Sequence, residues 1–573
     1  MSMQPGSWPP VPEETARMVR AAFPKGSLPI RIRDELGVWC QDEDFADLFG
    51  SRGRPGVPPA MLAVVSVLQF CENLTDRQAA DAVRGRMDWK YCLGLELTDP
   101  GFDFSVLNEF RGRLTGGSAE QRLLDLLLAR CAELGLVRGG MRQRTDSTHV
   151  LARIRVLNRL ELAGESVRAA LEELAAAQPG WLETVIDASW RTTYGRPVAG
   201  RRLPAGQAAR AELAVQYARD GYCLLERLAA PGAPPGAAAL PAVQVLRTVL
   251  IQQFRRSGGG DGAEVIWRED EKNGGDGLPP GRTLIISPYD TDARYSEKRG
   301  TGWSGYKAHY GETASDPALD DPRTGRAQHP NLVTACATTH AAVADITMTG
   351  PVHDQLARRN LTPAEHAVDS GYASAAELTA ARNRGITLIT PVLADTSPQA
   401  RSGGYTAGMF DIDWDARQVT CPQGKTASSW TPVTTSTGQD QIMVRFSARD
   451  CKPCPARGNC TTARRNGRQL GLHPRHIHDE LTAARAEQST AEWKRRYASR
   501  AGVEGLMAQA SHVTGTRRAR YLGLPKTTLE HTIAACALNF IRLDAWWTFA
   551  PTDRKRTSNL HHLNLIAATS LSF

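Results

Sequence analysis

The stretch EHAVDSGYASAAELTAARNRGITLITPV, residues 365–392, decides the fold of this chain. Residues 365–368 predict a short apolar strand that ends immediately before Asp369, and Ser374 predicts the start of a helix. Residues 386–392 predict a second apolar strand. This alternation of strands and a helix indicates an α/β sheet. Asp369 therefore lies at the carboxyl end of a strand, where open α/β sheets place their functional sites.

A second aspartate, Asp146, lies inside a predicted strand. Residues 141–150, MRQRTDSTHV, are β-branched and polar, and aspartate is disfavoured at such positions unless it has a role. We expect further strands at residues 283–287, 305–310, 332–339 and 342–349. The predicted core is a mixed sheet flanked by helices, built from residues 136–154, 280–395 and 491–550.

A third acidic residue lies on a predicted helix. Four side chains there are spaced by four, three and four residues: Trp493, Tyr497, Arg500 and Glu504. This spacing places them on one helical face, in a basic neighbourhood that suits a DNA backbone. Together with Asp146 and Asp369, Glu504 can supply oxygen ligands for two Mg²⁺ ions, which suits phosphoryl transfer. The alternative is three unrelated acidic residues that cap helices or form ion pairs.

Composition indicates a soluble protein of two to four domains. The chain has 573 residues, is 41% hydrophobic and carries a net charge of +8. The N-terminal residues lack the pattern of a signal peptide, and no apolar run approaches the roughly 20 residues that span a bilayer. Eleven mostly scattered cysteines indicate reduced thiols, so we expect a cytoplasmic protein without membrane contact.

Residues 1–135 predict an N-terminal helical domain. Thr75 and Gln78 form a capping-box pattern, and outward arginines, Arg111 and Arg113, resemble a helix-turn-helix DNA-binding module. A plain helical bundle with solvated arginines is the alternative. Residues 155–279 predict a helical insert in which Trp190 and Arg191 either stack on bases and contact phosphates or belong to an ordinary connecting loop.

Residues 396–490 predict a cysteine-containing insert. Four of its cysteines have a spacing compatible with a tetrahedral zinc site: Cys421, Cys451, Cys454 and Cys460. Nearby basic residues suit a small DNA-contacting ribbon, and four reduced thiols in a loosely packed insert are the alternative. Cys536 instead lies on an apolar helical face, which predicts a core position. Residues 551–573 predict a flexible tail.

Several short motifs resemble one protein family. They are Thr145-Asp-Ser-Thr148, Asp292-Ala-Arg-Tyr295, Trp303-Ser-Gly-Tyr-Lys-Ala-His309, Val368-Asp-Ser-Gly-Tyr372, Tyr497-x2-Arg500-x3-Glu504 and Arg518-Ala-Arg-Tyr-Leu-Gly-Leu524. The chain resembles the DDE-type transposases of bacterial insertion sequences, of the IS-four/IS-five-like assemblage and closest to its eleven-eighty-two group.

The resemblance implies an α/β RNase H-like catalytic core and a transposase that binds the terminal inverted repeats of an insertion sequence. It implies DNA cleavage and strand transfer that depend on Mg²⁺, with Mn²⁺ as an alternative. Asp146, Asp369 and Glu504 would be the metal ligands. Double-stranded DNA of the element ends and of the target would be the partner, handled by a homodimer. A DNA-binding protein derived from a transposase, or a nuclease without strand transfer, are the alternatives.

The resemblance also implies roles for residues around the carboxylates. Tyr497 and Arg500 would position terminal phosphates, and we interpret them as such rather than as salt-bridge partners. Lys307 and His309 share one face of their strand and would reach the DNA backbone. The chain departs from the family pattern at Ser511, where a basic residue is expected; His512 or the pair Arg517 and Arg518 are the candidate substitutes.

Overall fold

The computed structural model describes residues 2–3, 5–50, 52–257, 264–269, 277–298, 300–315, 327–392, 395, 397–435 and 438–549. The expected flexible tail, 551–573, lies outside these residues. The chain divides into two compact units. The first unit comprises Met1–Val137, Ser147–Val343 and Leu506–Phe573, and the second comprises Arg138–Asp146 and Ala344–Gly505.

The N-terminal part of the first unit is helical, as the sequence predicts. Its elements are α1 (Glu13–Ala22), α2 (Leu28–Arg31), η1 (Ile32–Leu36), η2 (Asp42–Leu48), α3 (Pro59–Cys71), α4 (Asp76–Gly85), α5 (Met87–Leu93), α6 (Ser105–Gly116) and α7 (Arg122–Glu133). The predicted capping box is confirmed at α4. Thr75 Oγ1 accepts from the Gln78 backbone N–H at 3.3 Å, and Gln78 Oε1 accepts from the Thr75 backbone N–H at 2.9 Å.

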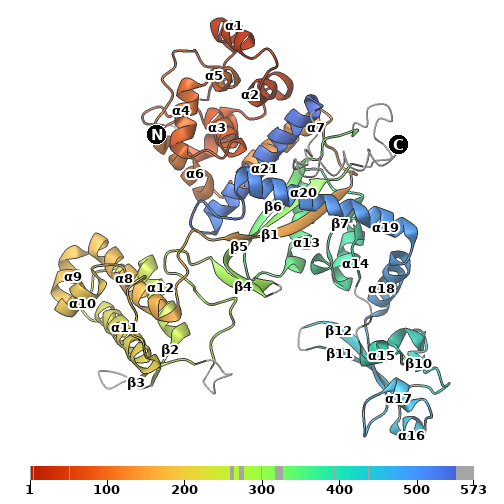
Figure 1. Ribbon diagram of the computed structural model, residues 1–573. Coiled ribbons are helices and arrows are strands. Elements are labelled where there is room, and N and C mark those ends of the chain that lie inside the picture. The colour runs from red at the N-terminus through yellow and green to blue at the C-terminus, as the bar shows by residue number, and fades with distance from the viewer. Residues whose placement is uncertain are drawn as a thin grey trace, which may run out of the picture. The chain divides into compact units, whose positions relative to one another are not determined.

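The long helix α21 (Leu524–Trp547) organises the core of the first unit. It packs against α3, α7 and the sheet strand β6 (Val333–His340). Figure 1 shows α21 in dark blue beside the red and orange N-terminal helices. Five residues of its predicted apolar face are buried: Leu529, Ile533, Cys536, Phe540 and Leu543. The sixth, Trp547, is only partly buried. The expected core position of Cys536 is therefore confirmed.

The first unit contains the antiparallel strands β4 (Arg294–Lys298), β5 (Thr301–Thr313) and β6. Strand β1 (Gln143–Leu151) begins in the second unit and continues into the first. The hydrogen-bonded order is β4-β5-β1-β7-β8, with β6 paired to β5. Gly305 is required where β5 meets β1, because a Cβ there would lie 2.2 Å from the Val150 carbonyl oxygen and φ is +149°.

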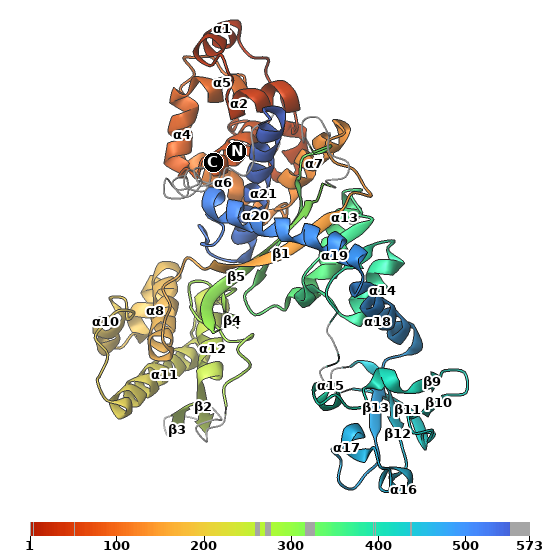
Figure 2. The same ribbon diagram turned by 45° about the vertical axis from the view of Figure 1, so that its right-hand side comes forward.

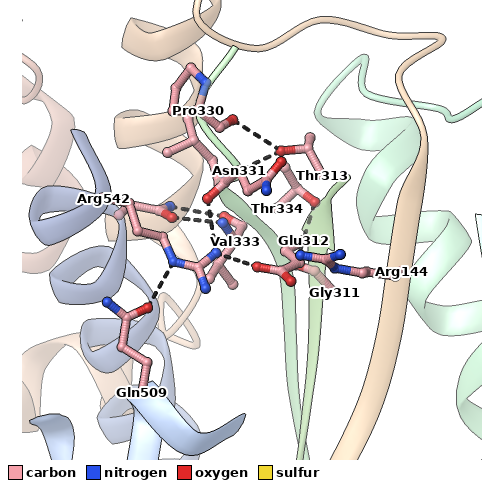
Figure 3. A network of polar contacts seen from close by, with 12 residues as sticks. Arg144, Gly311, Glu312, Thr313, Pro330, Asn331, Val333, Thr334, Gln509 and Arg542 are labelled. Atoms are coloured by element: carbon pink, nitrogen blue, oxygen red, sulfur yellow. Dashed lines mark hydrogen bonds and ion pairs between the residues drawn. The ribbon is translucent and has the colours of Figure 1, made fainter. Parts of the chain in front are cut away.

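A buried polar network joins α21 to β5 and β6 (Figure 3). The Glu312 carboxylate is fully buried and forms an ion pair with the Arg542 guanidinium. Arg542 also donates to Gln509 Oε1 at 2.9 Å and to the Asn331 carbonyl at 2.8 Å. The Asn539 side chain accepts from Val333 N at 2.6 Å and donates to its carbonyl at 2.9 Å. Because all these groups find partners, burial of charge is compatible with a stable core.

The expected helical insert also belongs to the first unit. Its elements are α8 (Arg159–Ala177), α9 (Pro179–Val185), α10 (Ala188–Tyr194), α11 (Gln207–Ala229), η3 (Ala237–Ala239), α12 (Pro241–Gln253) and the antiparallel pair β2 (Phe254–Ser257) and β3 (Glu264–Trp267). They enclose an apolar core of their own. Residues 283–287 do not form the expected strand. A turn that begins at Pro280 ends there, and the Ile285 N–H donates to Gln252 Oε1 at 3.0 Å instead of to a neighbouring strand.

The second unit contains the parallel strands β7 (Glu365–Ala367) and β8 (Thr387–Ile389) beside the start of β1. Its helices are η6 (Asp345–Met348), α13 (Thr349–Arg358), η7 (Ser370–Tyr372), α14 (Ala375–Asn383), α18 (Arg475–Gln488), α19 (Ala491–Ala498), η9 (Ser499–Ala501) and α20 (Gly502–Gln509), which ends in the first unit. The strand–helix–strand prediction for 365–392 is confirmed. The strand expected at 342–349 is wrong, because these residues form a turn and η6.

Residues 397–472 form a small module of the second unit, here called the cysteine module. Its elements are α15 (Pro398–Arg401), η8 (Ala407–Met409), β9 (Asp411–Asp413), β10 (Gln418–Thr420), β11 (Ser429–Thr434), β12 (Asp440–Arg445), α16 (Ala448–Cys451), α17 (Arg457–Cys460) and β13 (Gln469–Leu472). Strands β11, β12 and β13 form an antiparallel sheet, seen in Figure 2. The module is thus more regular than its polar sequence indicates.

Candidate active site

Strand register brings two of the three predicted carboxylates together. In the parallel pair of β1 and β7, Arg144 is the partner of Ala367. Two residues further along each strand stand Asp146 and Asp369, so both lie at the same level of the sheet. Asp369 also caps η7, since its Oδ1 accepts from the Gly371 N–H at 2.9 Å. The expected site at the carboxyl end of β7 therefore contains two aspartates at the same level of the sheet, one on β1 and one just beyond the end of β7.

One guanidinium contacts both aspartates. Arg500 Nη2 lies 2.6 Å from Asp146 Oδ2 and 3.9 Å from Asp369 Oδ2. The side chains of Arg500 and Asp146 are each 16% exposed, and that of Asp369 is 31% exposed. Our interpretation that Arg500 is not a salt-bridge partner is wrong for this structure. Two carboxylates this close repel each other, and the guanidinium offsets the repulsion.

The helices that carry Arg500 are fixed on the sheet by aromatic packing. Trp493 and Tyr497 of α19 stack with ring centroids 4.9 Å apart, and they pack against Ala367 and Ile389 of β7 and β8. Burial raises the pKa of Tyr497; Arg500 lowers it, whereas Asp369 and Asp146 raise it further. These influences show that the Tyr497 hydroxyl lies within electrostatic range of the Arg500–aspartate cluster.

The expected continuous helical face is divided into three segments. Trp493 and Tyr497 belong to α19, Arg500 belongs to the tighter helix η9, and Glu504 belongs to α20. Arg144 supports this change of helix, because its Nη1 donates to the Ser499 carbonyl at 2.8 Å. A Cβ on Gly502 would lie 2.0 Å from the same nitrogen, so an alanine there would require the Arg144 guanidinium to move.

Glu504 is exposed on α20, one turn beyond Arg500. The structure does not assemble it with Asp146 and Asp369 as a ready metal site. Within the described ranges, no group of three or more His, Cys, Asp and Glu side chains is arranged to hold a metal ion. The site therefore consists of two aspartates held by an arginine on η9, with the glutamate on the next helix, α20.

A buried histidine chain beside Asp146 was missed by the sequence analysis. His353 Nε2 lies 2.9 Å from His366 Nδ1, and His366 Nε2 lies 2.8 Å from Thr145 Oγ1. Burial lowers the pKa of His353 to about 4 and that of His366 well below its usual value. Both rings are therefore neutral near pH 7. Together they tie α13 and β7 to the residue that precedes Asp146. The histidine inside the apolar strand 365–368 was the available sequence clue.

Two of the residues expected to contact the DNA backbone from β5 lie inside the protein. His309 is fully buried, and its Nε2 lies 3.1 Å from Thr339 Oγ1. The expectation that His309 reaches DNA is wrong, because the sheet covers its ring. Lys307 is half-buried and donates to the Val343 carbonyl at 2.7 Å. The alternation of side chains along a strand correctly placed both residues on one face of β5, but this face is covered by the rest of the protein.

Of the other residues expected to contact DNA, two have buried side chains and two have accessible ones. Arg111 is 4% exposed, forms an ion pair with Asp76 and lies over the Tyr521 ring, so it is not an outward arginine. Trp190 is also 4% exposed, in the core of the helical insert, and cannot stack on a base there. Arg113 is half-buried and Arg191 is exposed, so DNA contact by these two stays a prediction.

The four cysteines predicted to bind zinc line one small cavity of the cysteine module, about 30 Å³ in volume. All four side chains are partly exposed, and none forms a disulfide. Burial raises the pKa of the Cys460 thiol; Arg468 lowers it, whereas Cys451, Cys421 and Cys454 raise it. The structure thus brings together thiols that are 39 positions apart in sequence, from Cys421 to Cys460.

Two family models match the chain. The model of the Transposase DDE domain matches residues 420–544, and the model of the Transposase domain (DUF772) matches residues 18–113. Both matches support a DDE-type transposase. Among curated proteins, none is similar enough in sequence to count as a match.

For this transposase, family membership implies an enzyme that acts on DNA and a general use of divalent metal ions. The expected family is confirmed, and the mixed sheet flanked by helices is compatible with the RNase H-like core. The DDE-domain match contains Glu504 and the four cysteines, whereas Asp146 and Asp369 lie outside it. Across the described residues, no helix is long and apolar enough to cross a membrane.

Ser511 stands where the family pattern has a basic residue. Its hydroxyl donates to the Met507 carbonyl at 2.9 Å, so it serves the local helix backbone within η10 (Ala510–Thr514). The three candidate substitutes are exposed: His512, Arg517 and Arg518. Their exposure leaves each able to make the missing contact with a phosphate.

Proposed function

We propose that the protein binds the terminal inverted repeats of an insertion sequence and catalyses metal-dependent cleavage and strand transfer of its DNA. Asp146 and Asp369, side by side at one sheet edge in a chain of the DDE-type family, are the observation that carries the proposal. The eleven-eighty-two group is the proposed subfamily, because the short motifs around these residues resemble it.

The donor set fits Mg²⁺, with Mn²⁺ as an alternative. Both aspartates offer hard oxygen ligands, and both face one cationic group in the structure. A cation is therefore already favoured at this position. When bound, the ions would activate the attacking oxygen and stabilise the leaving oxygen of the phosphoryl transfer. Glu504 would complete the ligand set after a movement of its side chain or of α20.

Arg500 has a second role in this proposal, as a phosphate ligand. Its Nε is buried and has no hydrogen-bond acceptor among the described residues, so the guanidinium has donor capacity left beyond the aspartates. Once divalent cations neutralise the carboxylates, the fork of the guanidinium can bind a DNA phosphate with two hydrogen bonds. The Tyr497 hydroxyl would donate to the same phosphate. Lys494 and Arg495, exposed on α19, would hold the adjoining backbone.

The protein chain itself positions the reacting groups. The histidine chain from α13 through β7 holds Thr145, and thereby the strand segment that carries Asp146. Arg144 holds the backbone of η9, and thereby Arg500. We propose that a homodimer in the cytoplasm handles the two element ends together, because one site can process one end at a time.

Cleavage of DNA that carries the flanking inverted repeats tests the proposal. With Mg²⁺, we expect cuts at the repeat ends and joined products. Asp146→Asn, Asp369→Asn and Glu504→Gln should each abolish the chemistry while DNA binding survives. Glu492→Gln is the matched control, because Glu492 is exposed on α19 and its change should preserve activity.

Each other outcome has a definite meaning. Undiminished cutting by any of the three carboxylate variants removes that residue from the site. Cleavage without joining favours the nuclease, and binding without cleavage in either Mg²⁺ or Mn²⁺ favours a DNA-binding protein derived from a transposase.

A further inference from the structure

The cysteine module has a small apolar core, and a bound metal ion would add stability to it. Its apolar core has six buried side chains, and the other apolar residues packed against them are only partly buried. The six are Phe410, Val419, Val444, Phe446, Leu470 and Leu472. A core this small is marginal for a separate module, and natural modules of this size are commonly stabilised by disulfides or by a structural metal. None of the module's cysteines is in a disulfide. Three of them, Cys421, Cys451 and Cys460, pack against this core.

The four thiols come from two turns that face the same cavity. Cys421 begins the first turn: its N–H donates to the Lys425 carbonyl at 2.8 Å, and its carbonyl accepts from the Gly424 N–H at 2.8 Å. The Lys425 N–H points at Cys421 Sγ, 3.4 Å away. Gly424 adopts φ +74°, a conformation that closes this turn.

The second turn contributes the other three thiols. Cys451 ends α16, Cys460 ends α17, and Cys454 lies between the two short helices. The Arg457 N–H donates to the Cys454 carbonyl at 3.1 Å and closes the turn. All three cysteines line the 30 Å³ cavity together with Cys421. The cavity is large enough to admit a particle of the size of a water molecule.

We propose that Cys421, Cys451, Cys454 and Cys460 bind one structural Zn²⁺ ion, which fixes the two turns to each other. Four sulfur ligands from two short turns match the tetrahedral preference of zinc, and the ion would supply folding energy that the six-residue core lacks. No group of three described side chains is already arranged for a metal, so the thiols must turn into the shared cavity when zinc binds.

Zinc would also hold a basic surface in place for DNA. From residue 421 to 472 the sequence contains eight Lys or Arg and two Asp. Six of the basic side chains are exposed: Lys425, Arg445, Arg449, Lys452, Arg464 and Arg465. Lys425 and Lys452 belong to the two cysteine turns themselves. The partner that this charge fits is the phosphate backbone of the DNA on which the transposase acts.

Metal analysis of the full-length protein, purified without chelator, tests the zinc site. We expect about one zinc per chain in the wild type and a loss of most of it in Cys451→Ser/Cys454→Ser. Cys223→Ser is the matched control, because Cys223 is also partly buried but lies in α11, outside the cysteine module. This variant should keep its zinc. Near-zero zinc in the wild type, or equal zinc in all three proteins, overturns the proposal.

Substitution with Co²⁺ identifies the ligands independently of folding. Cobalt bound by four thiolates in a tetrahedron has strong visible absorption, which weakens and shifts when one ligand is lost. We expect Cys421→Ser to change this spectrum and Cys223→Ser to leave it unchanged. A wild-type spectrum typical of octahedral oxygen ligands contradicts the proposal.

The DNA contact has its own measurement. Lys425→Gln/Lys452→Gln should keep zinc but reduce the slope of log affinity against log salt by about 2, roughly one for each lost phosphate contact. Arg382→Gln is the control, since Glu480 already neutralises that guanidinium at 2.7 Å. An unchanged slope in the double variant shows that the module does not contact DNA, whereas the zinc proposal is judged by the metal analysis alone.

Discussion

Arg500→Gln provides a direct test of the arrangement around the two aspartates. In the structure the Arg500 guanidinium lies where a cation between Asp146 and Asp369 would lie. Divalent ions must therefore displace it before they bind. Removal of this guanidinium should strengthen metal binding in the absence of DNA, although it should also weaken cleavage.

The expected size of the effect follows from the contact that is lost. The Arg500–Asp146 hydrogen bond is 2.6 Å long, and both side chains are 16% exposed. A charge-assisted hydrogen bond of this kind contributes about 1.5–3 kcal/mol. Because some solvent screening remains, we expect the lower part of this range. Divalent ions should therefore bind the Arg500→Gln variant roughly 10-fold more tightly, with about 100-fold as the upper limit.

Calorimetric titration of the DNA-free protein with Mn²⁺ measures this change. Arg496→Gln is the matched control, because Arg496 is similarly buried but pairs with Glu365 and Glu487 instead of the aspartates. It should leave Mn²⁺ affinity unchanged. Equal Mn²⁺ affinity in the wild type, Arg500→Gln and Arg496→Gln would falsify the reasoning. If the Mn²⁺ affinity of Arg500→Gln rises but its cleavage does not fall, Arg500 is not a phosphate ligand. The competition between Arg500 and divalent ions for the aspartates would still be supported.

Two further predictions concern the elements that position the site. Gly502→Ala should displace the Arg144 guanidinium from η9 and reduce cleavage at least tenfold, with little loss of stability because the atoms that must move end a flexible side chain. Gly505→Ala, whose Cβ would meet nothing within 4 Å, should leave both cleavage and urea unfolding unchanged. Acid should destabilise the second unit through its buried histidines. His353 has a folded pKa of about 4, below its usual 6.5, so its contribution is present above pH 6.5 and is lost as the pH falls toward 4, on the order of 3 kcal/mol. His366 acts in the same direction. Urea unfolding at several pH values should show this slope, and its persistence in His353→Gln/His366→Gln would assign the slope to other groups.

Local patterns in the sequence predicted the elements that local physics dictates. The capping box at Thr75, the helix start at Ser374 and the buried face of α21 all follow from spacings within a few residues. The strand prediction at residues 342–349 failed, because an apolar–polar alternation does not distinguish a strand from a turn followed by a helix.

Burial was harder to predict than the elements themselves. Arg111, Trp190 and His309 have side chains that suit nucleic acid, but the tertiary structure places all three in the interior. Each has found a partner there: Asp76 for Arg111, Arg227 for Trp190 and Thr339 for His309. Residue type indicates which interactions a side chain can make, whereas packing decides with which partner it makes them.

The sequence alone predicted the family, the strand–helix–strand segment at residues 365–392, and the two aspartates and four cysteines as candidate ligands, because each depends on residue type and short spacing. Only the tertiary structure decided what stands next to them. The parallel register of β1 and β7 put Asp146 beside Asp369, and the packing of α19 on these strands placed Arg500 between them. Contacts between residues more than 100 positions apart depend on how the chain closes on itself, and no local pattern records that closure.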